Sequence, residues 1–222
     1  MQLDLNSKPI ALAALRLASG HHAGIKRKYT GEPYIKHPVR VAQKIMQFGI
    51  HDQLAIAAAL LHDCVEDDDI HGDKMSIGTI AAACGPFVAD LVTALTCSGG
   101  GNRAERKARY HTKIARSHLF VKNIKCADVI DNVQGIVALD PNFAPTYLAE
   151  KASLAAMLKP GMKNLPIFQE LQEVLALQHN LLAMHYVNTG KEEKARRVVE
   201  DYKLNQLADE IANGAFADCA VF

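Results

Sequence analysis

The residues best suited to chemistry lie in the run 62–67 (HDCVED), which ends an apolar stretch. His62 and Asp63 are both common metal ligands, and neighbouring residues of a helix point about 100° apart. They can reach one ion only if it lies beside the helix and other segments complete its coordination. Glu66 and Asp67 are expected one turn later, on the face of Asp63. Because such acids repel one another unless positive charge compensates, the run is either half of a metal site or a solvated acidic helix end.

Two further residues could complete a metal site. His37 precedes Pro38, where a loop becomes a helix, and the proline fixes its position. Asp128 lies in an otherwise apolar helix start (IKCADVIDNV), and a buried carboxylate needs a partner or a metal. Taken singly, His37 resembles an exposed loop histidine, and an ion-paired position remains open for Asp128. Together with His62 and Asp63 they form a mixed imidazole and carboxylate set, which suits Mn²⁺ or Fe²⁺ and leaves Zn²⁺ open.

A strongly basic stretch would suit a phosphorylated substrate. Residues 103–116 contain a single acid, Glu105, against six cations: Arg103, Arg106, Lys107, Arg109, Lys113 and Arg116. Such a helix is either a solvated face or, beside a metal, a binding surface for a polyphosphate. A metal could lower the pKa of a bound water and polarise a phosphoryl group, and fixed cations would neutralise charge on a leaving pyrophosphate.

The segments that must position these residues are predicted to be helices. Asp52 and Ser76 are expected to cap two of them. Apolar spacing and Pro or Gly punctuation give the ranges 9–28, 38–48, 52–66, 77–84, 86–96, 102–117, 119–139, 145–158, 166–188 and 191–212. No segment alternates as a half-buried strand would, so the sequence predicts an all-α fold.

The whole-chain composition narrows the class of protein. The 222 residues are 49% hydrophobic and 22% charged, with a formal net charge of +1, which is typical of a globular chain and suggests no nucleic-acid or membrane partner. No apolar run approaches a membrane span of about 18 residues, and the first helix is expected to be amphipathic rather than a signal peptide. Five scattered cysteines without a C-x-x-C pair favour a reduced, cytoplasmic protein.

These motifs resemble the HD-domain phosphohydrolase superfamily, whose ligands occur in the order H…HD…D. The resemblance is closest to RelA/SpoT-type alarmone hydrolases, including their small stand-alone members. The similar stretches are 31–42 (GEPYIKHPVRVA), 57–67 (AAALLHDCVED) and 124–133 (IKCADVIDNV). The resemblance implies an HD-domain helical bundle over residues 1–163. Residues 164–222 would be a C-terminal helical extension, packed on the core or forming the interface of a homodimer.

The resemblance also implies roles for individual residues. Mn²⁺ would be held by His37, His62, Asp63 and Asp128, and Glu66 and Asp67 match the pair that orients or activates the attacking water. The implied contacts to the nucleotide are Arg27, Lys28, Arg106, Lys107, Asn132 and Tyr147. The implied reaction removes the 3′-pyrophosphate of guanosine tetra- or pentaphosphate and gives GDP or GTP and pyrophosphate.

One stretch departs from the family pattern and keeps alternatives open. Where such hydrolases have a sequence like LADRLHN, this chain has CADVIDN, with Val129, Ile130 and Asp131 in place of basic and bulky residues. The change leaves the metal ligands intact but leaves the nucleotide open, so an HD-type nucleotidase or phosphohydrolase for another phosphorylated nucleotide is the alternative. A non-enzymatic nucleotide sensor or scaffold is a third hypothesis, which the complete ligand set and the Glu66-Asp67 pair disfavour.

Overall fold

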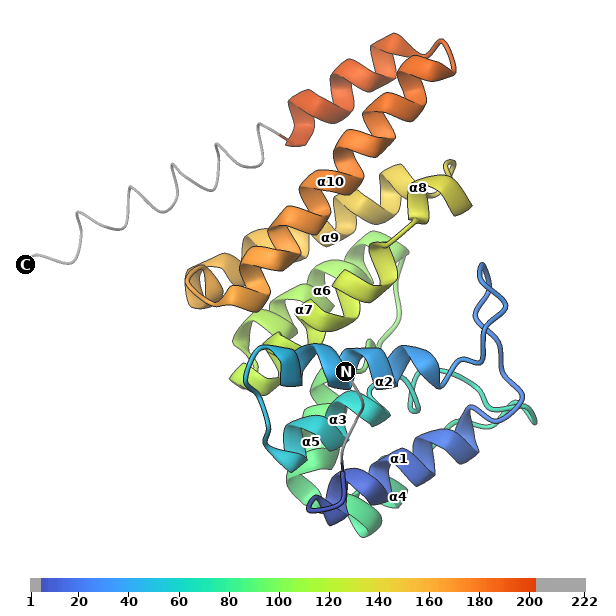
Figure 1. Ribbon diagram of the computed structural model, residues 1–222, viewed down its shortest axis with the longest axis vertical. Coiled ribbons are helices and arrows are strands. Elements are labelled where there is room, and N and C mark those ends of the chain that lie inside the picture. The colour runs from blue at the N-terminus through green and yellow to red at the C-terminus, as the bar shows by residue number, and fades with distance from the viewer. Residues whose placement is uncertain (1–4, 203–222) are drawn as a thin grey trace, which may run out of the picture. The chain divides into compact units, whose positions relative to one another are not determined.

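The computed structural model describes residues 5–202, and within this range its regular structure is helical (Figure 1). Backbone pairing of the β type occurs there only as two isolated bridges, Lys26 with Pro33 and Asp68 with Lys74. The helices are α1 (Pro9–His21), α2 (Lys36–Gln47), α3 (Gln53–Leu61), α4 (Ile77–Cys84), α5 (Pro86–Leu95), α6 (Arg103–Arg116), α7 (Leu119–Val133), α8 (Ile136–Leu139), α9 (Ala144–Met162) and α10 (Pro166–Asn188). The all-α prediction is confirmed.

The helix predicted over 52–66 is shorter than expected, and this changes how the site is built. Its start is as predicted, since Asp52 Oδ1 accepts hydrogen bonds from Leu54 N and Ala55 N at 2.7 and 3.2 Å. However, α3 ends at Leu61, and residues 62–66 form turns. The amides of Cys64 and Glu66 reach back three residues rather than four, to Leu61 O at 3.1 Å and Asp63 O at 3.0 Å. The histidine–aspartate pair therefore lies just beyond a helix end and not within a helix.

Other boundaries differ for local reasons. The helix predicted over 9–28 ends at His21, shortly before Gly24, whose φ of +77° a helix cannot contain. The helix predicted over 119–139 is interrupted in the same way by Gly135, at φ +76°.

Proline and the chain end account for two further differences. Pro160 was expected to end a helix, yet α9 continues to Met162, because a proline in the last turn removes only one ladder hydrogen bond and the Lys163 amide still reaches Lys159 O at 3.0 Å. Residues 192–202 are helical, and the remainder of the helix predicted over 191–212 lies outside the described residues.

The chain packs as two units, divided between Asp131 and Asn132 within α7. In the first unit α3 is the central helix, and it contacts α1, α2 and α5 (Figure 1). All residues from Ala55 to Leu61 are buried, as expected for a helix that is apolar on every side. The first unit thus places the end of a fully buried helix, and the histidine–aspartate pair that follows it, inside the core.

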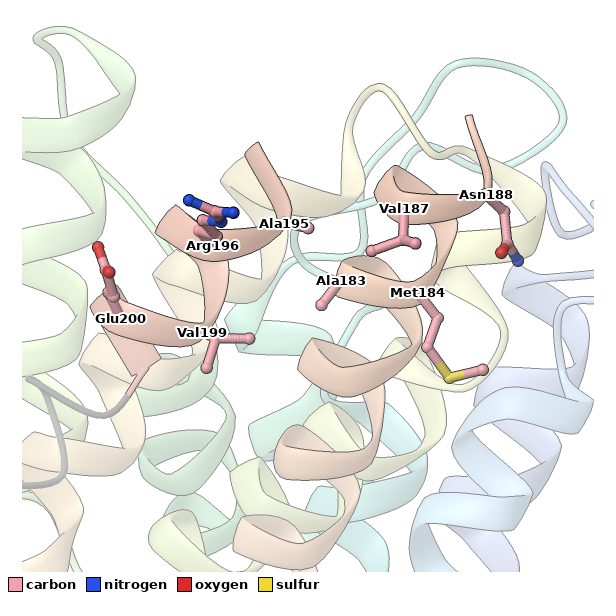
Figure 2. A pocket seen from close by; sticks show the side chains of 8 residues that line it. All are labelled: Ala183, Met184, Val187, Asn188, Ala195, Arg196, Val199 and Glu200. Atoms are coloured by element: carbon pink, nitrogen blue, oxygen red, sulfur yellow. The ribbon is translucent and has the colours of Figure 1, made fainter. Parts of the chain in front are cut away.

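In the second unit α9 and α10 form a helical hairpin, and α10 also contacts α8. This unit has a pocket of about 570 Å³ between the end of α10 and the helical residues 192–202 (Figure 2). Its lining is mainly aliphatic and lacks histidine and cysteine: Ala183, Met184, Val187, Asn188, Ala195, Arg196, Val199 and Glu200. None of the predicted site residues lines it, so this pocket is not the place of the expected chemistry. Across residues 5–202, no helix is long and apolar enough to cross a membrane.

Candidate metal centre

The four predicted metal ligands meet in the first unit. His37 lies at the start of α2, His62 and Asp63 follow α3, and Asp128 lies in α7. His37 Nε2 is 3.4 Å from Asp63 Oδ2 and 3.3 Å from Asp128 Oδ1, and His62 Nε2 is 3.2 and 3.6 Å from the same two oxygens. Within the part of the chain that the structure describes, His37, His62 and Asp63 form the only group of three such side chains whose ligand atoms all lie within 4.8 Å of one another.

The histidine nitrogens at this centre fit a metal ion. The side chains of His37 and His62 are 1% and 3% exposed, and neither Nε2 atom has a hydrogen-bond partner. Burying a polar atom without a partner is costly, so two such atoms that face the same pair of carboxylates are expected where a cation binds. Imidazole and carboxylate donors are a suitable set for a divalent transition metal.

The electrostatics of the centre also call for positive charge. Burial disfavours the imidazolium of His62, but the carboxylates of Asp63 and Asp128 outweigh it and raise the pKa to about 9. Burial and the same carboxylates act in opposite directions on His37, and its pKa is likewise raised. Without a metal, protons on the imidazoles supply the charge that a divalent cation would otherwise bring.

Each histidine is held by a hydrogen bond at its other ring nitrogen. His62 Nδ1 donates to Ala59 O at 2.8 Å, and His37 Nδ1 donates to Asp131 Oδ2 at 2.7 Å. Both acceptors lack a proton to give, so Nδ1 must be the donor in each ring. A neutral imidazole with its proton on Nδ1 directs the Nε2 lone pair toward the metal position.

The carboxylates have partners as well. Tyr34 Oη donates to Asp63 Oδ2 at 2.9 Å, and Lys125 Nζ donates to Asp128 Oδ2 at 2.6 Å. Although burial opposes ionisation of Asp128, the charge of Lys125 and the facing histidines hold its pKa well below the usual range. Sequence reasoning missed Tyr34, Lys125 and the contact of Asp131. Only the spacing of Lys125, three residues before Asp128 on one helix, signalled a pair.

Glu66 and Asp67 lie in the turn after the metal ligands rather than on a helical face shared with Asp63. The carboxylate of Glu66 accepts a hydrogen bond from the amide of Cys97. Burial raises the pKa of Glu66, and burial together with the negative charge of Asp63 raises the pKa of Asp67. Two half-buried carboxyl groups with raised pKa values are suited to accepting a proton near neutral pH.

The predicted nucleotide contacts Arg27 and Lys28 of the first unit have different partners. Arg27 Nη1 donates to Asp131 Oδ2 at 2.7 Å, and this carboxylate also accepts the hydrogen bond from His37. Lys28 is exposed and lies over the ring of Tyr29, with 4.7 Å from Nζ to the ring centroid. Sequence reasoning also did not single out Arg40, whose Nε donates to Asp131 Oδ1 at 2.5 Å.

The remaining predicted contacts lie on α6 and in the second unit. Arg106 Nη1 donates to Gly101 O at 2.7 Å, within the loop before α6. The ammonium groups of Lys107 and Lys125 lie 5.6 and 5.1 Å from the ring centroid of Tyr110, so one aromatic ring connects the basic helix with the partner of Asp128. The second unit includes Asn132, at the end of α7, and Tyr147, on α9, so their place at the site stays a prediction.

Comparison with known proteins identifies the class. Residues 14–122 match the family described as HD domain. A solved structure titled "A metazoan ortholog of SpoT hydrolyzes ppGpp and plays a role in starvation responses" superimposes with a TM-score of 0.67 at 26% identity, covering 76% of this chain and 95% of that chain. The fold and the centre therefore define an HD-domain protein.

Sequence relatives narrow the family. Over 167 residues the chain is 30% identical to guanosine-3′,5′-bis(diphosphate) 3′-pyrophosphohydrolase MESH1 of Mus musculus, covering 74% of this chain and 89% of that protein. It is 32% identical to MESH1 of Drosophila melanogaster, covering 59% of this chain and 71% of that protein. The chain belongs to this family of guanosine-3′,5′-bis(diphosphate) 3′-pyrophosphohydrolases, which confirms the resemblance.

Longer relatives match as well. The chain is 39% identical to a probable guanosine-3′,5′-bis(diphosphate) 3′-pyrophosphohydrolase of Synechocystis sp., over 54% of this chain and 16% of that protein. It is 30% identical to the Aquifex aeolicus protein of the same activity name, over 86% of this chain and 26% of that protein. The chain thus spans about a quarter or less of the length of these curated relatives.

Proposed function

We propose that this protein is a metal-dependent phosphohydrolase that removes the 3′-pyrophosphate from guanosine tetra- or pentaphosphate. The products would be GDP or GTP and pyrophosphate. The observation that carries the proposal is the convergence of two unpartnered histidine nitrogens and two carboxylate oxygens in a buried centre. It is supported by the names of relatives such as MESH1 of Mus musculus, most of whose length the chain covers.

The proposed ligands of the metal are His37, His62, Asp63 and Asp128. Their mixed donor set favours Mn²⁺, with Fe²⁺ or Zn²⁺ as alternatives. When bound, the metal would supply a Lewis acid for the phosphoryl oxygens and a water of lowered pKa. Hydrogen bonds at the second nitrogen of each histidine and at the second oxygen of Asp128 would keep these donors directed at one point, and Tyr34 would hold Asp63 through Oδ2 itself.

We propose that Glu66 and Asp67 orient the attacking water and accept its proton. Their raised pKa values make them stronger proton acceptors than an exposed carboxylate would be. The amide of Cys97 holds the Glu66 side chain in one orientation, which supports a positioning role for this residue.

The proposed substrate contacts are cations of the first unit and two residues of the second. Lys107 shares the Tyr110 ring with Lys125, whose ammonium contacts Asp128, so a cation of α6 is linked to the centre. Fixed positive charge there would stabilise the charge that develops on the leaving pyrophosphate. The full proposed set is Arg27, Lys28, Arg106, Lys107, Asn132 and Tyr147.

The partner of the reaction would be a small nucleotide rather than a nucleic acid or a membrane. We also propose the cytoplasm as its location and a division into an HD domain, 1–163, and a helical extension, 164–222. Size-exclusion chromatography with light scattering on the full chain and on residues 1–163 would test whether the extension holds a homodimer.

The function is tested by incubating the purified protein with Mn²⁺ and guanosine tetraphosphate and measuring pyrophosphate and GDP. Equal amounts of the two products are expected. The second candidate, an HD-type hydrolase of another phosphorylated nucleotide, is favoured by the departure at Asp131, which binds the predicted substrate contact Arg27. Turnover of a nucleoside monophosphate without pyrophosphate release would select this second candidate.

A further inference from the structure

Asp131 joins one proposed metal ligand to two arginines. Its Oδ2 accepts hydrogen bonds from His37 Nδ1 and Arg27 Nη1, both at 2.7 Å. Its Oδ1 accepts from Arg40 Nε at 2.5 Å, and its Oδ2 accepts from Arg40 Nη2 at 3.1 Å, so this arginine contacts both carboxylate oxygens. The Asp131 side chain is only 12% exposed.

The contact with His37 has a specific consequence for metal binding. An imidazole binds a metal through Nε2 only when its other proton is on Nδ1, and a carboxylate at Nδ1 enforces that state. His62 obtains the same effect from the carbonyl of Ala59, three residues earlier in the chain. His37 depends instead on a side chain 94 positions away in the sequence.

Helix α7 therefore holds His37 from both sides. Asp128 and Asp131 are three residues apart and lie on one helix face. Asp128 Oδ1 is 3.3 Å from His37 Nε2, whereas Asp131 Oδ2 is 2.7 Å from Nδ1. One face of α7 thus supplies a ligand of the proposed metal and the outer partner of another ligand.

The arginines make a mostly buried carboxylate possible at this position. A carboxylate removed from water is costly unless it is paired and hydrogen-bonded, and Arg40 provides a two-point contact while Arg27 adds a third donor. Arg40 also donates to Glu32 Oε1 at 2.7 Å. Glu32 is thus a second carboxylate that binds Arg40. The structure gives no hydrogen bond between Glu32 and His37 in its described residues.

We infer that Asp131 is a positioning residue of the metal centre, which fixes the proton of His37 on Nδ1 and its ring toward the metal, and ties Arg27 and Arg40 to that centre. The inference rests on the proposed metal site but not on the identity of the nucleotide. Asp131 is one of the positions at which this chain departs from the stretch typical of the family, so the family resemblance does not imply this contact.

The test compares Mn²⁺ binding by calorimetry to the full-length, metal-free protein and to Asp131→Ala, Asp131→Asn and Glu32→Gln. Loss of an outer partner typically weakens metal binding about 10- to 100-fold, and this is expected for Asp131→Ala. The asparagine variant keeps an oxygen that accepts from Nδ1, so its loss is expected to be smaller. Glu32→Gln perturbs the same Arg40 and is expected to bind as the wild type does. Wild-type affinity in Asp131→Ala, or an equal loss in Glu32→Gln, would overturn the inference.

A second measurement separates positioning from general stability. In the Zn²⁺-loaded wild type, a ¹H–¹⁵N spectrum of the histidine rings should show a slowly exchanging Nδ1–H on His37, and Asp131→Ala should lose this signal while His62 keeps its own. If the alanine variant fails to fold, the same spectrum is recorded on Asp131→Asn, which is expected to retain the Nδ1–H signal of His37. A His37 signal unchanged in the alanine variant, or absent from the wild type, would contradict the assignment. Neither measurement contains a nucleotide, so failure of pyrophosphate release would count against the proposed function alone.

Discussion

Lys125 and Asp128 form a close ion pair inside the first unit, with 2.6 Å between Nζ and Oδ2. The pair occupies one oxygen of the aspartate and leaves Oδ1 facing both histidines, 3.3 Å from His37 Nε2 and 3.6 Å from His62 Nε2. The lysine thereby decides which oxygen of Asp128 is available to a metal, and it supplies part of the charge that keeps this carboxylate ionised.

We expect Lys125→Met to weaken metal binding by about tenfold or more, the range typical of a lost outer partner. The Asp128 pKa should rise when the ammonium is removed, so metal binding should fail at a higher pH as the solution is acidified. Calorimetric titration with Mn²⁺ between pH 5 and 8 would measure both effects. Lys122→Met, on the same helix, is the matched control and should bind as the wild type does. Unchanged affinity at every pH in Lys125→Met would remove this role.

Asp63 is expected to be indispensable for the metal, because its Oδ2 faces both histidine nitrogens. Asp63→Ala should therefore lose the bound metal and all metal-dependent hydrolysis. Metal content by mass spectrometry and pyrophosphate release would be measured on the same preparation. Asp68→Ala, which removes an exposed neighbour that pairs with Lys74 at 4.0 Å, should change neither quantity. Full metal content in Asp63→Ala would show that the ligand assignment is wrong.

The paired substitution Glu66→Gln/Asp67→Asn should retain the metal and lower turnover by about 10²- to 10⁴-fold, the usual contribution of a general base. A protonated carboxyl group cannot accept a proton, so wild-type activity should fall as the pH drops through the pKa values of these groups. Because burial raises both pKa values, the acid limb should lie above the ordinary carboxyl value of about 4. A pH–rate profile would measure the limb, and wild-type turnover in the variant would refute the role.

Metal binding should release protons near neutral pH. Burial lowers the pKa of His62, but the carboxylates of Asp63 and Asp128 outweigh burial and raise it to about 9 in the metal-free protein. This imidazolium stabilises the metal-free fold below its unfolded pKa of about 6.5, and the stabilisation is lost as the pH rises through about 9. A metal must displace that proton, so its affinity should increase with pH.

Two measurements check this linkage. Calorimetry in buffers of different ionisation enthalpy should show proton release at pH 7.5. The gain in melting temperature on adding Mn²⁺ to protein treated with a chelator should be larger at pH 8.5 than at pH 6. At a metal concentration 100 times Kd the gain corresponds to about 2.7 kcal/mol. A gain that shrinks with rising pH would contradict the charge state assigned to His62.

Much of the fold could be predicted because its signals are local. The range 166–188 is reproduced by α10, and Ser76 caps α4 as expected, with its Oγ accepting from Thr79 N at 3.0 Å. Periodic apolar spacing, a capping side chain and a proline in the first turn all act within a few residues, so they can be recognised in the sequence. The candidate ligands could be predicted in the same way, since residue type and order along the chain identify His37, His62, Asp63 and Asp128.

What only the tertiary structure decided are the contacts between distant parts of the chain. Tyr34 and Asp63 are 29 positions apart and Arg27 and Asp131 are 104 apart, and no local pattern links either pair. The end of α3 at Leu61 was also decided only in the structure, because the helix pattern of the sequence continues to residue 66. The sequence alone determined which side chains could bind a metal. Folding decided how the donor atoms face the centre, because the partners of His37 and Asp63 come from distant parts of the chain, whereas those of His62 and Asp128 lie three residues earlier.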